Sequence, residues 1–85
     1  MHNKVKDSTI LVTGGAGFIG SYVIEELIPL QPKKIVIIDN FIRGTKENMK
    51  SFINNPIIEI HNADIRETDK LEACIAGCDY VFHMA

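Results

Sequence analysis

The chain has 85 residues, so it can bury only about 60–65% of the surface it would expose when unfolded, and we expect one small domain with a modest core. A net charge of −2 provides no electrostatic basis for binding nucleic acid or an anionic membrane. No apolar run is long enough to span a bilayer, and the polar first residues do not resemble a secretory signal, so a cytoplasmic protein is expected.

The first half of the chain alternates between strand and helix patterns. A short apolar run predicts a strand over about 9–13, and apolar residues at helical spacing predict a helix from Phe18 to about 27 or 28. The next strand covers about 34–39. Its four consecutive β-branched residues do not alternate with polar ones, which indicates burial on both faces, as in a parallel sheet.

The second half continues the alternation. Thr45 is suited to cap a helix, and Gly77 is suited to end one. The predicted elements are a helix over about 46–53, a strand over 57–61, a helix that opens at Thr68, and a strand over 80–83.

The resulting β-α-β-α-β-α-β pattern predicts an α/β fold of the Rossmann type, built on a parallel sheet with right-handed crossovers. The expected strand order is 3-2-1-4, with the first two helices on one face and the third on the other. The switch point, where ligands of such sheets bind, then lies between the first and fourth strands. We expect these strands to be the first part of a larger sheet.

A glycine-rich turn joins the first strand to the first helix. Gly14 permits a tight turn, Gly17 leaves room for a phosphate to approach the backbone, and Gly20 allows the helix to pack closely against the first strand. The amides of Gly17, Phe18 and Ile19 are then expected to be unpaired donors at a helix N-terminus, where an anion is favoured. A purely structural glycine turn in another α/β protein is the alternative.

Acidic residues follow the second and third strands. Asp39 is placed to accept hydrogen bonds from the adenosine ribose of a dinucleotide and to repel a 2′-phosphate, which favours NAD over NADP. Arg43 just after that strand is the competing signal, because a basic residue there can bind a 2′-phosphate. Asp64 can accept a hydrogen bond from adenine, with Ile65 covering the ring. The alternative role of Asp64, a turn-former or helix cap, stays open.

The sequence contains no catalytic pair that spacing would support. A dehydrogenase site of this type needs a phenol and an ammonium group, yet Tyr22 and Tyr80 are followed four residues later by Glu26 and Met84. Cys74 and Cys78 lie four apart, which is not the spacing of a zinc or redox pair. We therefore predict no catalytic residue and no metal site in this chain.

Four segments together resemble the extended short-chain dehydrogenase/reductase family, in particular its nucleotide-sugar epimerases and dehydratases, with UDP-glucose and UDP-N-acetylglucosamine 4-epimerases the most similar. These segments are residues 12–20, 39–41, 63–66 and 81–85. The resemblance implies a pyrophosphate on the glycine turn, and an adenosine held by residues after the next two strands. The implied cofactor-binding set is Gly14, Gly17, Phe18, Ile19, Gly20, Asp39, Asn40, Arg43, Gly44, Asp64, Ile65 and Ala85.

The resemblance also implies that the chain is only part of an enzyme. Relatives of this kind oxidise a sugar hydroxyl by hydride transfer to NAD and later return the hydride, using a Tyr and a Lys that have no counterpart here. We expect residues 1–85 to be a partial NAD(P)-binding domain that is inactive alone, without the sugar-binding and catalytic parts. The alternatives are a non-catalytic NAD(P)-binding or sensor module, and a reductase of a non-sugar ketone or alcohol.

A last expectation concerns association. If the fourth strand has no further neighbour, it forms a free apolar edge, and the chain is expected to self-associate through it or through the face that carries the third helix.

Overall fold

The computed structural model describes residues 4–41, 44–64 and 66–84. Its regular elements alternate as the sequence predicts. They are β1 (Thr9–Thr13), α1 (Phe18–Leu27), the 3-10 helix η1 (Ile28–Leu30), β2 (Lys34–Asp39), the 3-10 helix η2 (Glu47–Met49), β3 (Ile58–Asn62), α2 (Thr68–Ile75) and β4 (Tyr80–His83).

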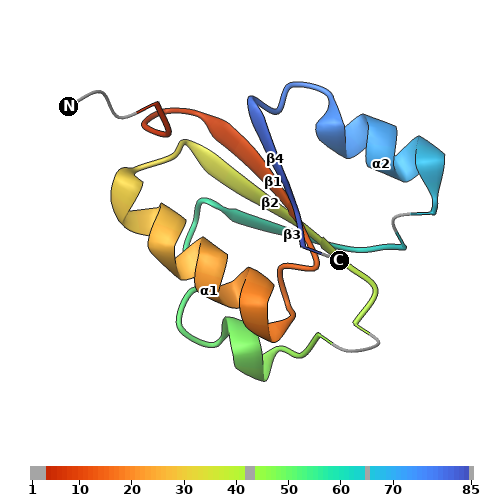
Figure 1. Cartoon of the computed structure of the whole chain (residues 1–85), viewed down its shortest axis with the longest axis horizontal. Helices are drawn as coiled ribbons and strands as arrows, with labels where there is room; N and C mark the ends of the chain where they lie inside the picture. The colour runs from red at the N-terminus through yellow and green to blue at the C-terminus, as the bar shows by residue number, and fades with distance from the viewer. Residues whose placement is uncertain (1–3, 42–43, 65, 85) are drawn as a thin grey trace.

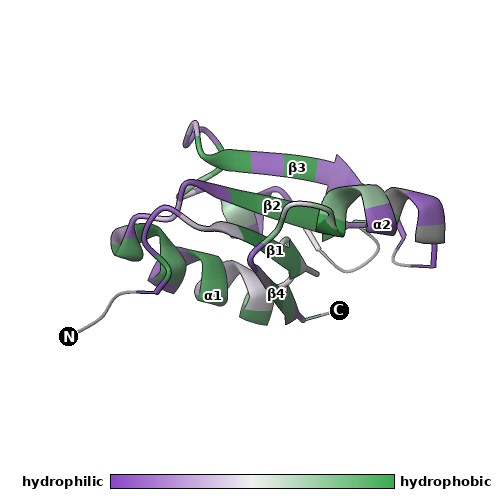
Figure 2. Cartoon of the chain, turned by 90° about the horizontal axis from the view of Figure 1, so that it is seen from above, coloured by the Kyte–Doolittle hydropathy of each residue, from purple (hydrophilic) through white to green (hydrophobic). Residues whose placement is uncertain are grey.

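The four strands form one parallel sheet in the order β3-β2-β1-β4, which confirms the predicted Rossmann-type topology. In the register, Val12 of β1 lies beside Ile37 of β2 on one side and Phe82 of β4 on the other. The outer strands β3 and β4 form the two edges of the described sheet (Figure 2). The carboxyl ends of β1 and β4 therefore meet where the order reverses, at the switch point.

Apolar side chains pack on both faces of the sheet, because alternate residues of β1 and β2 point to opposite sides. On one face, Ile10 and Val12 pack in a cluster with Ile24 and Leu27 of α1. On the other face, Leu11 and its β2 neighbours pack against α2 and the turn after it. Figure 1 shows α1 and α2 on opposite sides of the sheet, as predicted. All four residues 35–38 are buried, which confirms a strand covered on both faces.

The predicted helix over 46–53 is wrong in type and length. The segment forms only the short 3-10 helix η2, followed by turns through Asn54. Met49 and Phe52 are both buried in the α1-side cluster. The segment continues as successive turns, in which the Met49 carbonyl accepts from the Phe52 amide at 2.9 Å and from the Ile53 amide at 2.8 Å.

Two smaller differences concern β3 and α1. The ladder of β3 begins one residue later than expected, because the Ile57 amide donates to the Asn55 side chain at 3.1 Å and closes a turn. On α1, Ile24 and Leu27 are buried, but Ile19 is 59% exposed. Only part of the apolar face of α1 is therefore buried against the sheet, and the rest is exposed to solvent.

Candidate functional site

A tight glycine turn connects β1 to α1. Gly14 has φ 72°, the left-handed conformation that glycine adopts without strain, and its amide donates to the Ile38 carbonyl at 2.7 Å. A Cβ on Gly20 would collide with the Gly14 carbonyl oxygen and lie 2.9 Å from the Gly14 carbonyl carbon. Gly20 thus allows α1 to pack against the turn that follows β1, rather than against the strand itself as the sequence had indicated.

The N-terminus of α1 presents main-chain donors. Gly17 caps the helix without a side-chain hydrogen bond, and the first bond across the cap runs from the Ser21 amide to the Gly17 carbonyl at 2.9 Å. Within the described residues, the amides of Phe18 and Ile19 have no acceptor. The prediction that the Gly17 amide is also unpaired is wrong, because it donates to the Gly14 carbonyl at 3.0 Å and closes the turn.

Space for a ligand lies over this turn. Among the described residues, a Cβ built on Gly17 would meet only the Gly14 carbonyl oxygen, at 3.2 Å. The side of the backbone that a Cβ would occupy is therefore free, while the neighbouring amides mark a helix N-terminus. Such an arrangement favours a phosphate or another anion.

Asp39, at the end of β2, is joined to the glycine turn. Its carboxylate is buried; Oδ2 accepts from the Ala16 amide at 3.0 Å, and Oδ1 accepts from the Phe41 amide at 2.8 Å. A carboxylate offers about four acceptor positions, so these two bonds leave others for ligand hydroxyls. The acid predicted from its place after β2 thus lies beside the turn, where it also stabilises the turn and the following loop.

The loop after β2 closes on the same residue of the turn. The Ala16 carbonyl accepts from the Thr45 amide at 3.0 Å and from Asn48 Nδ2 at 2.9 Å. Gly44 makes this approach possible, because a Cβ there would lie 2.7 Å from both Ala16 Cβ and Asp39 Oδ2. Asn48 was not among the predicted site residues. Its donation to a residue 32 positions away is a tertiary contact that no local pattern signals.

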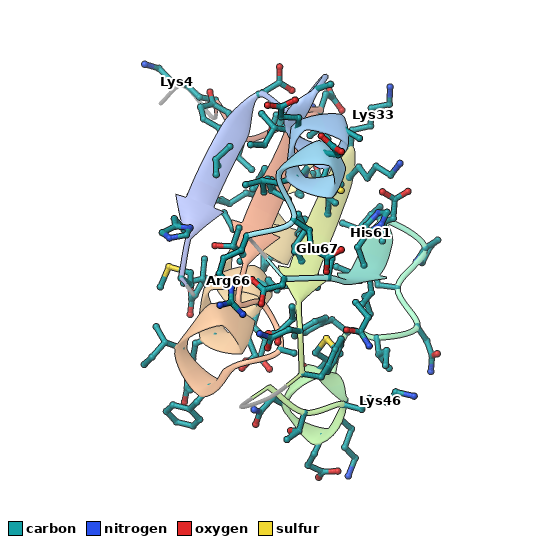
Figure 3. The ribbon with its side chains drawn as sticks, turned by 90° about the vertical axis from the view of Figure 1, so that its right-hand side faces the viewer. Lys4, Lys33, Lys46, His61, Arg66 and Glu67 are labelled. Carbon is teal, nitrogen blue, oxygen red and sulfur yellow. The ribbon has the colours of Figure 1, made fainter. Side chains whose placement is uncertain are left out.

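Asp64 lies between β3 and α2, where it caps the segment that leads into the helix. Oδ1 accepts from the Arg66 amide at 2.8 Å, and Oδ2 accepts from Arg66 Nη2 at 2.7 Å. Glu67 Oε1 accepts from the Asp64 amide at 3.1 Å. Figure 3 shows Arg66 and Glu67 on this connection. The turn-forming role that the sequence left open is therefore present.

Electrostatics at Asp64 follow from the same contacts. The pKa of the Asp64 carboxyl is lowered to about 2, and the largest cause is the hydrogen bonding from the Arg66 side chain. The Arg66 amide is the next contributor to this lowering, and the Asn40 side chain adds a smaller one in the same direction. Asn40 follows Asp39, so the ends of β2 and β3 meet at one edge of the sheet, as predicted for parallel strands.

At the switch point, β1 and β4 are linked through side chains. Thr13 Oγ1 lies 2.9 Å from His83 Nδ1, and the Met84 amide donates to the Thr13 carbonyl at 3.0 Å. Thr13 is buried while His83 is exposed. These contacts fix the direction in which the chain leaves β4, and neither residue of the Thr13–His83 pair was among the predicted site residues.

The structure gathers most of the predicted site residues at the carboxyl edge of the sheet. Arg43, Ile65 and Ala85 lie outside the described residues. The nine that are described belong to the glycine turn and to the segments after β2 and β3: Gly14, Gly17, Phe18, Ile19, Gly20, Asp39, Asn40, Gly44 and Asp64. In the described part of the chain, no group of three or more acidic, histidine or cysteine side chains could hold a metal ion.

A parallel 3-2-1-4 sheet, a glycine turn at a helix N-terminus and an acid at the end of β2 together define a Rossmann-type fold. A family model described as the 3-beta hydroxysteroid dehydrogenase/isomerase family matches residues 11–85. The chain therefore belongs to this family.

Sequence relatives lie among enzymes of nucleotide sugars. The chain is 37% identical over 76 residues to UDP-glucuronic acid decarboxylase 3 of Arabidopsis thaliana, covering 89% of this chain and 21% of that protein. It is 34% identical over 76 residues to UDP-glucuronic acid decarboxylase 1 of Danio rerio, covering 89% and 17%. These relatives agree with the predicted resemblance to nucleotide-sugar enzymes.

Solved structures share the fold. The Bordetella bronchiseptica enzyme WbmF, in complex with NAD+ and UDP, superposes with a TM-score of 0.86 at 28% identity, covering 100% of this chain and 25% of WbmF. The dTDP-glucose 4,6-dehydratase DesIV of Streptomyces venezuelae, with NAD bound, gives a TM-score of 0.85 at 29% identity, covering 91% and 26%.

The aligned region is only a small part of each sequence relative. The chain spans about a fifth of the length of the curated relatives it matches. Separately, none of the helices in the described segments combines the length and the apolar character that a membrane span requires.

Proposed function

We propose that this chain binds the adenosine diphosphate half of NAD, as the N-terminal part of an enzyme that modifies nucleotide sugars. The observation that carries the proposal is the joining of Asp39 to the glycine turn at Ala16, beside the unpaired amides of Phe18 and Ile19. This places an acceptor for ribose hydroxyls next to donors for a pyrophosphate. WbmF and DesIV, which were both solved with NAD bound, support the same cofactor.

The pyrophosphate would lie over the turn, against the Phe18 and Ile19 amides. The open side of Gly17 supports this placement, since any side chain there would occupy the space of a phosphate. Gly14 and Gly20 shape the turn and have no direct role in this proposal beyond the conformation and close packing they permit.

The adenosine would be held by the loops after β2 and β3. Asp39 would accept from the ribose hydroxyls, with Asn40 and Gly44 beside it, and its charge would disfavour the 2′-phosphate of NADP. Asp64 would accept from the adenine amino group. Its lowered pKa supports this role, because the carboxyl stays ionised as an acceptor. Arg43, Ile65 and Ala85 stay in the proposed cofactor-binding set, with Arg43 near the ribose, Ile65 over the adenine ring and Ala85 beside the nicotinamide half.

In the whole enzyme, bound NAD would accept a hydride from a sugar carbon and later return it. Residues 1–85 contain no Tyr-x-x-x-Lys pair to act as base for that step, so they would be a partial NAD-binding domain without catalysis of its own. The relatives are named as decarboxylases and the neighbours include dehydratases. The proposal includes both kinds of whole enzyme, an epimerase, which is an isomerase, and a dehydratase.

A second candidate follows from the family description, which names hydroxysteroid substrates. The same NAD-binding half would then serve the oxidation of a ring alcohol that is not a sugar. The names of the sequence relatives favour the nucleotide sugar. Assay of the whole enzyme with NAD and either a UDP-sugar or a hydroxysteroid separates the two.

We also make two smaller proposals. The first, self-association through β4, rests on the exposure of this strand, and the second, a cytoplasmic location, rests on the cysteines. Val81 of β4 is 50% exposed, and Phe82 lines an open apolar hollow of about 460 Å³ with Ile19 and Tyr22 of α1. Both cysteines are free thiols, in keeping with a reducing compartment.

The cofactor proposal is tested by titrating the chain with NAD+ in a calorimeter. The Asp39→Ala variant should bind NAD+ about tenfold or more weakly, because it loses a charged acceptor for the ribose. The matched control is Asp69→Ala, which removes an exposed carboxylate from α2. Absence of NAD+ binding by the unaltered chain, or equal affinity in both variants, would contradict the proposal.

A further inference from the structure

A side chain outside the proposed ligand contacts fixes the position of the glycine turn. Asn48 is half-buried at η2, and its Nδ2 donates to the Ala16 carbonyl at 2.9 Å. The Thr45 amide donates to the same oxygen at 3.0 Å. Both lone pairs of that carbonyl are therefore used, while the Ala16 amide is held by Asp39. The Ala16 amide and carbonyl are therefore both hydrogen-bonded, to residues at the end of β2 or in the segment that follows it.

The side chain of Asn48 suits its position because it is short and carries a hydrogen-bond donor. The backbone amide of Asn48 donates to Thr45 Oγ1 at 3.2 Å, which holds the start of η2 beside the turn. The side chain must then supply a donor to a carbonyl oxygen. Aspartate has the same shape but no donor, and its charge would face the Ala16 oxygen. Alanine would leave that oxygen with one partner fewer in a half-buried location.

The Ala16 carbonyl is rigidly linked to the next amide. The Ala16 oxygen and the Gly17 nitrogen belong to one planar peptide unit, so holding the oxygen also directs the Gly17 N–H toward the Gly14 carbonyl. The helix begins at the next residue. The direction of the Phe18 and Ile19 amides therefore depends on the orientation of this peptide.

We propose that Asn48 is a positioning residue for the pyrophosphate of the bound dinucleotide; this inference rests on the function proposed above. Asn48 acts through the Ala16–Gly17 peptide and does not touch the ligand. Its removal loosens the donors that face the phosphates and leaves the residues that face the adenosine in place. The signature of this role is a loss of affinity confined to ligands that carry a pyrophosphate.

The test compares the binding of two probes, ADP-ribose and adenosine, to the ¹⁵N-labelled 85-residue chain. Affinity for each probe is measured from the shifts of the backbone amide signals during a titration. In Asn48→Ala and Asn48→Asp we expect ADP-ribose to bind about tenfold more weakly, and adenosine to change by less than about twofold. Asn54→Ala is the matched control, since Asn54 is an exposed amide in the same segment. It should leave both affinities unchanged.

A second measurement separates positioning from general loss of structure. The Gly17 amide should exchange with solvent faster in Asn48→Ala, while core amides of β1 and β2 keep the protection they have in the unaltered chain. Equal weakening of both probes, or unchanged affinity for ADP-ribose, overturns the inference while the proposed function stands. If the unaltered chain binds neither probe, the proposed function itself is wrong and the inference falls with it.

Discussion

Asp39 Oδ2 accepts a hydrogen bond from the Ala16 amide at 3.0 Å, although 23 positions separate the two residues. The other oxygen of the same carboxylate accepts from the Phe41 amide at 2.8 Å. One buried acid thus satisfies a donor in the glycine turn and a donor in its own loop. A stabilising role and a proposed ligand-binding role are combined in this side chain.

Asp39→Asn is expected to destabilise the fold by about 1–3 kcal/mol, the usual effect of leaving a buried donor unsatisfied. An amide has one oxygen, so it can accept from either Ala16 or Phe41 and must turn its NH₂ toward the other. Urea unfolding followed by circular dichroism measures the change. Asp69→Asn, in the first turn of α2, is the control and should cost less than about 1 kcal/mol, the usual contribution of an exposed acid at a helix N-terminus. Unchanged stability of Asp39→Asn would show that these bonds contribute little.

Gly20→Ala should destabilise the chain by about 1–3 kcal/mol or more, because an added methyl group collides with backbone that cannot rotate away. The colliding atoms belong to Gly14, whose amide is itself bonded to β2. Elsewhere on a helix, alanine is more favourable than glycine, so propensity alone predicts the opposite sign. Thermal unfolding measures the effect, and Glu26→Ala on the exposed face of α1 serves as the reference. A stabilised Gly20→Ala variant would contradict the close packing described above.

The Asp64–Arg66 pair predicts a pH dependence. Because the folded-state pKa of Asp64 is lowered from 3.8 to about 2, its contribution to stability is fully present above the unfolded value and is lost as the pH falls toward 2. NMR titration of the Asp64 carboxyl carbon should give a midpoint near 2. In Arg66→Ala the midpoint should rise toward the ordinary value. An unchanged midpoint would mean that the neighbouring amides, and not the guanidinium, hold the charge.

The fold could be predicted from the sequence because its signals are local. The β-branched run of β2 and the left-handed Gly77 each determine their own segment, and alternation then determines the topology. The same holds for Asp39, which is recognised by its place at the end of a strand. These features depend on a few neighbouring residues, and a single sequence contains them.

Contacts between distant segments could not be predicted in this way. The Asn48 side chain donates to the Ala16 carbonyl, 32 positions away, because packing of Met49 and Phe52 in the α1-side cluster holds η2 beside the glycine turn. The Thr13–His83 contact depends in the same way on β4 lying next to β1. The pairing of the Gly17 amide depends on how tightly the turn closes, which the glycine spacing alone does not specify.

The exposed edge at β4 gives a final prediction. Within the described sheet, β4 pairs only with β1, so the opposite row of its backbone groups can pair with another chain. The unaltered chain should therefore show a mass above that of a monomer by light scattering at high micromolar concentration. Val81→Lys places a charge on this half-exposed strand and should return the mass to that of a monomer. Ile75→Lys, at an equally apolar position on α2 that is 40% exposed, is the control. If Ile75→Lys dissociates the assembly and Val81→Lys does not, the chains associate through the α2 face and not through the strand.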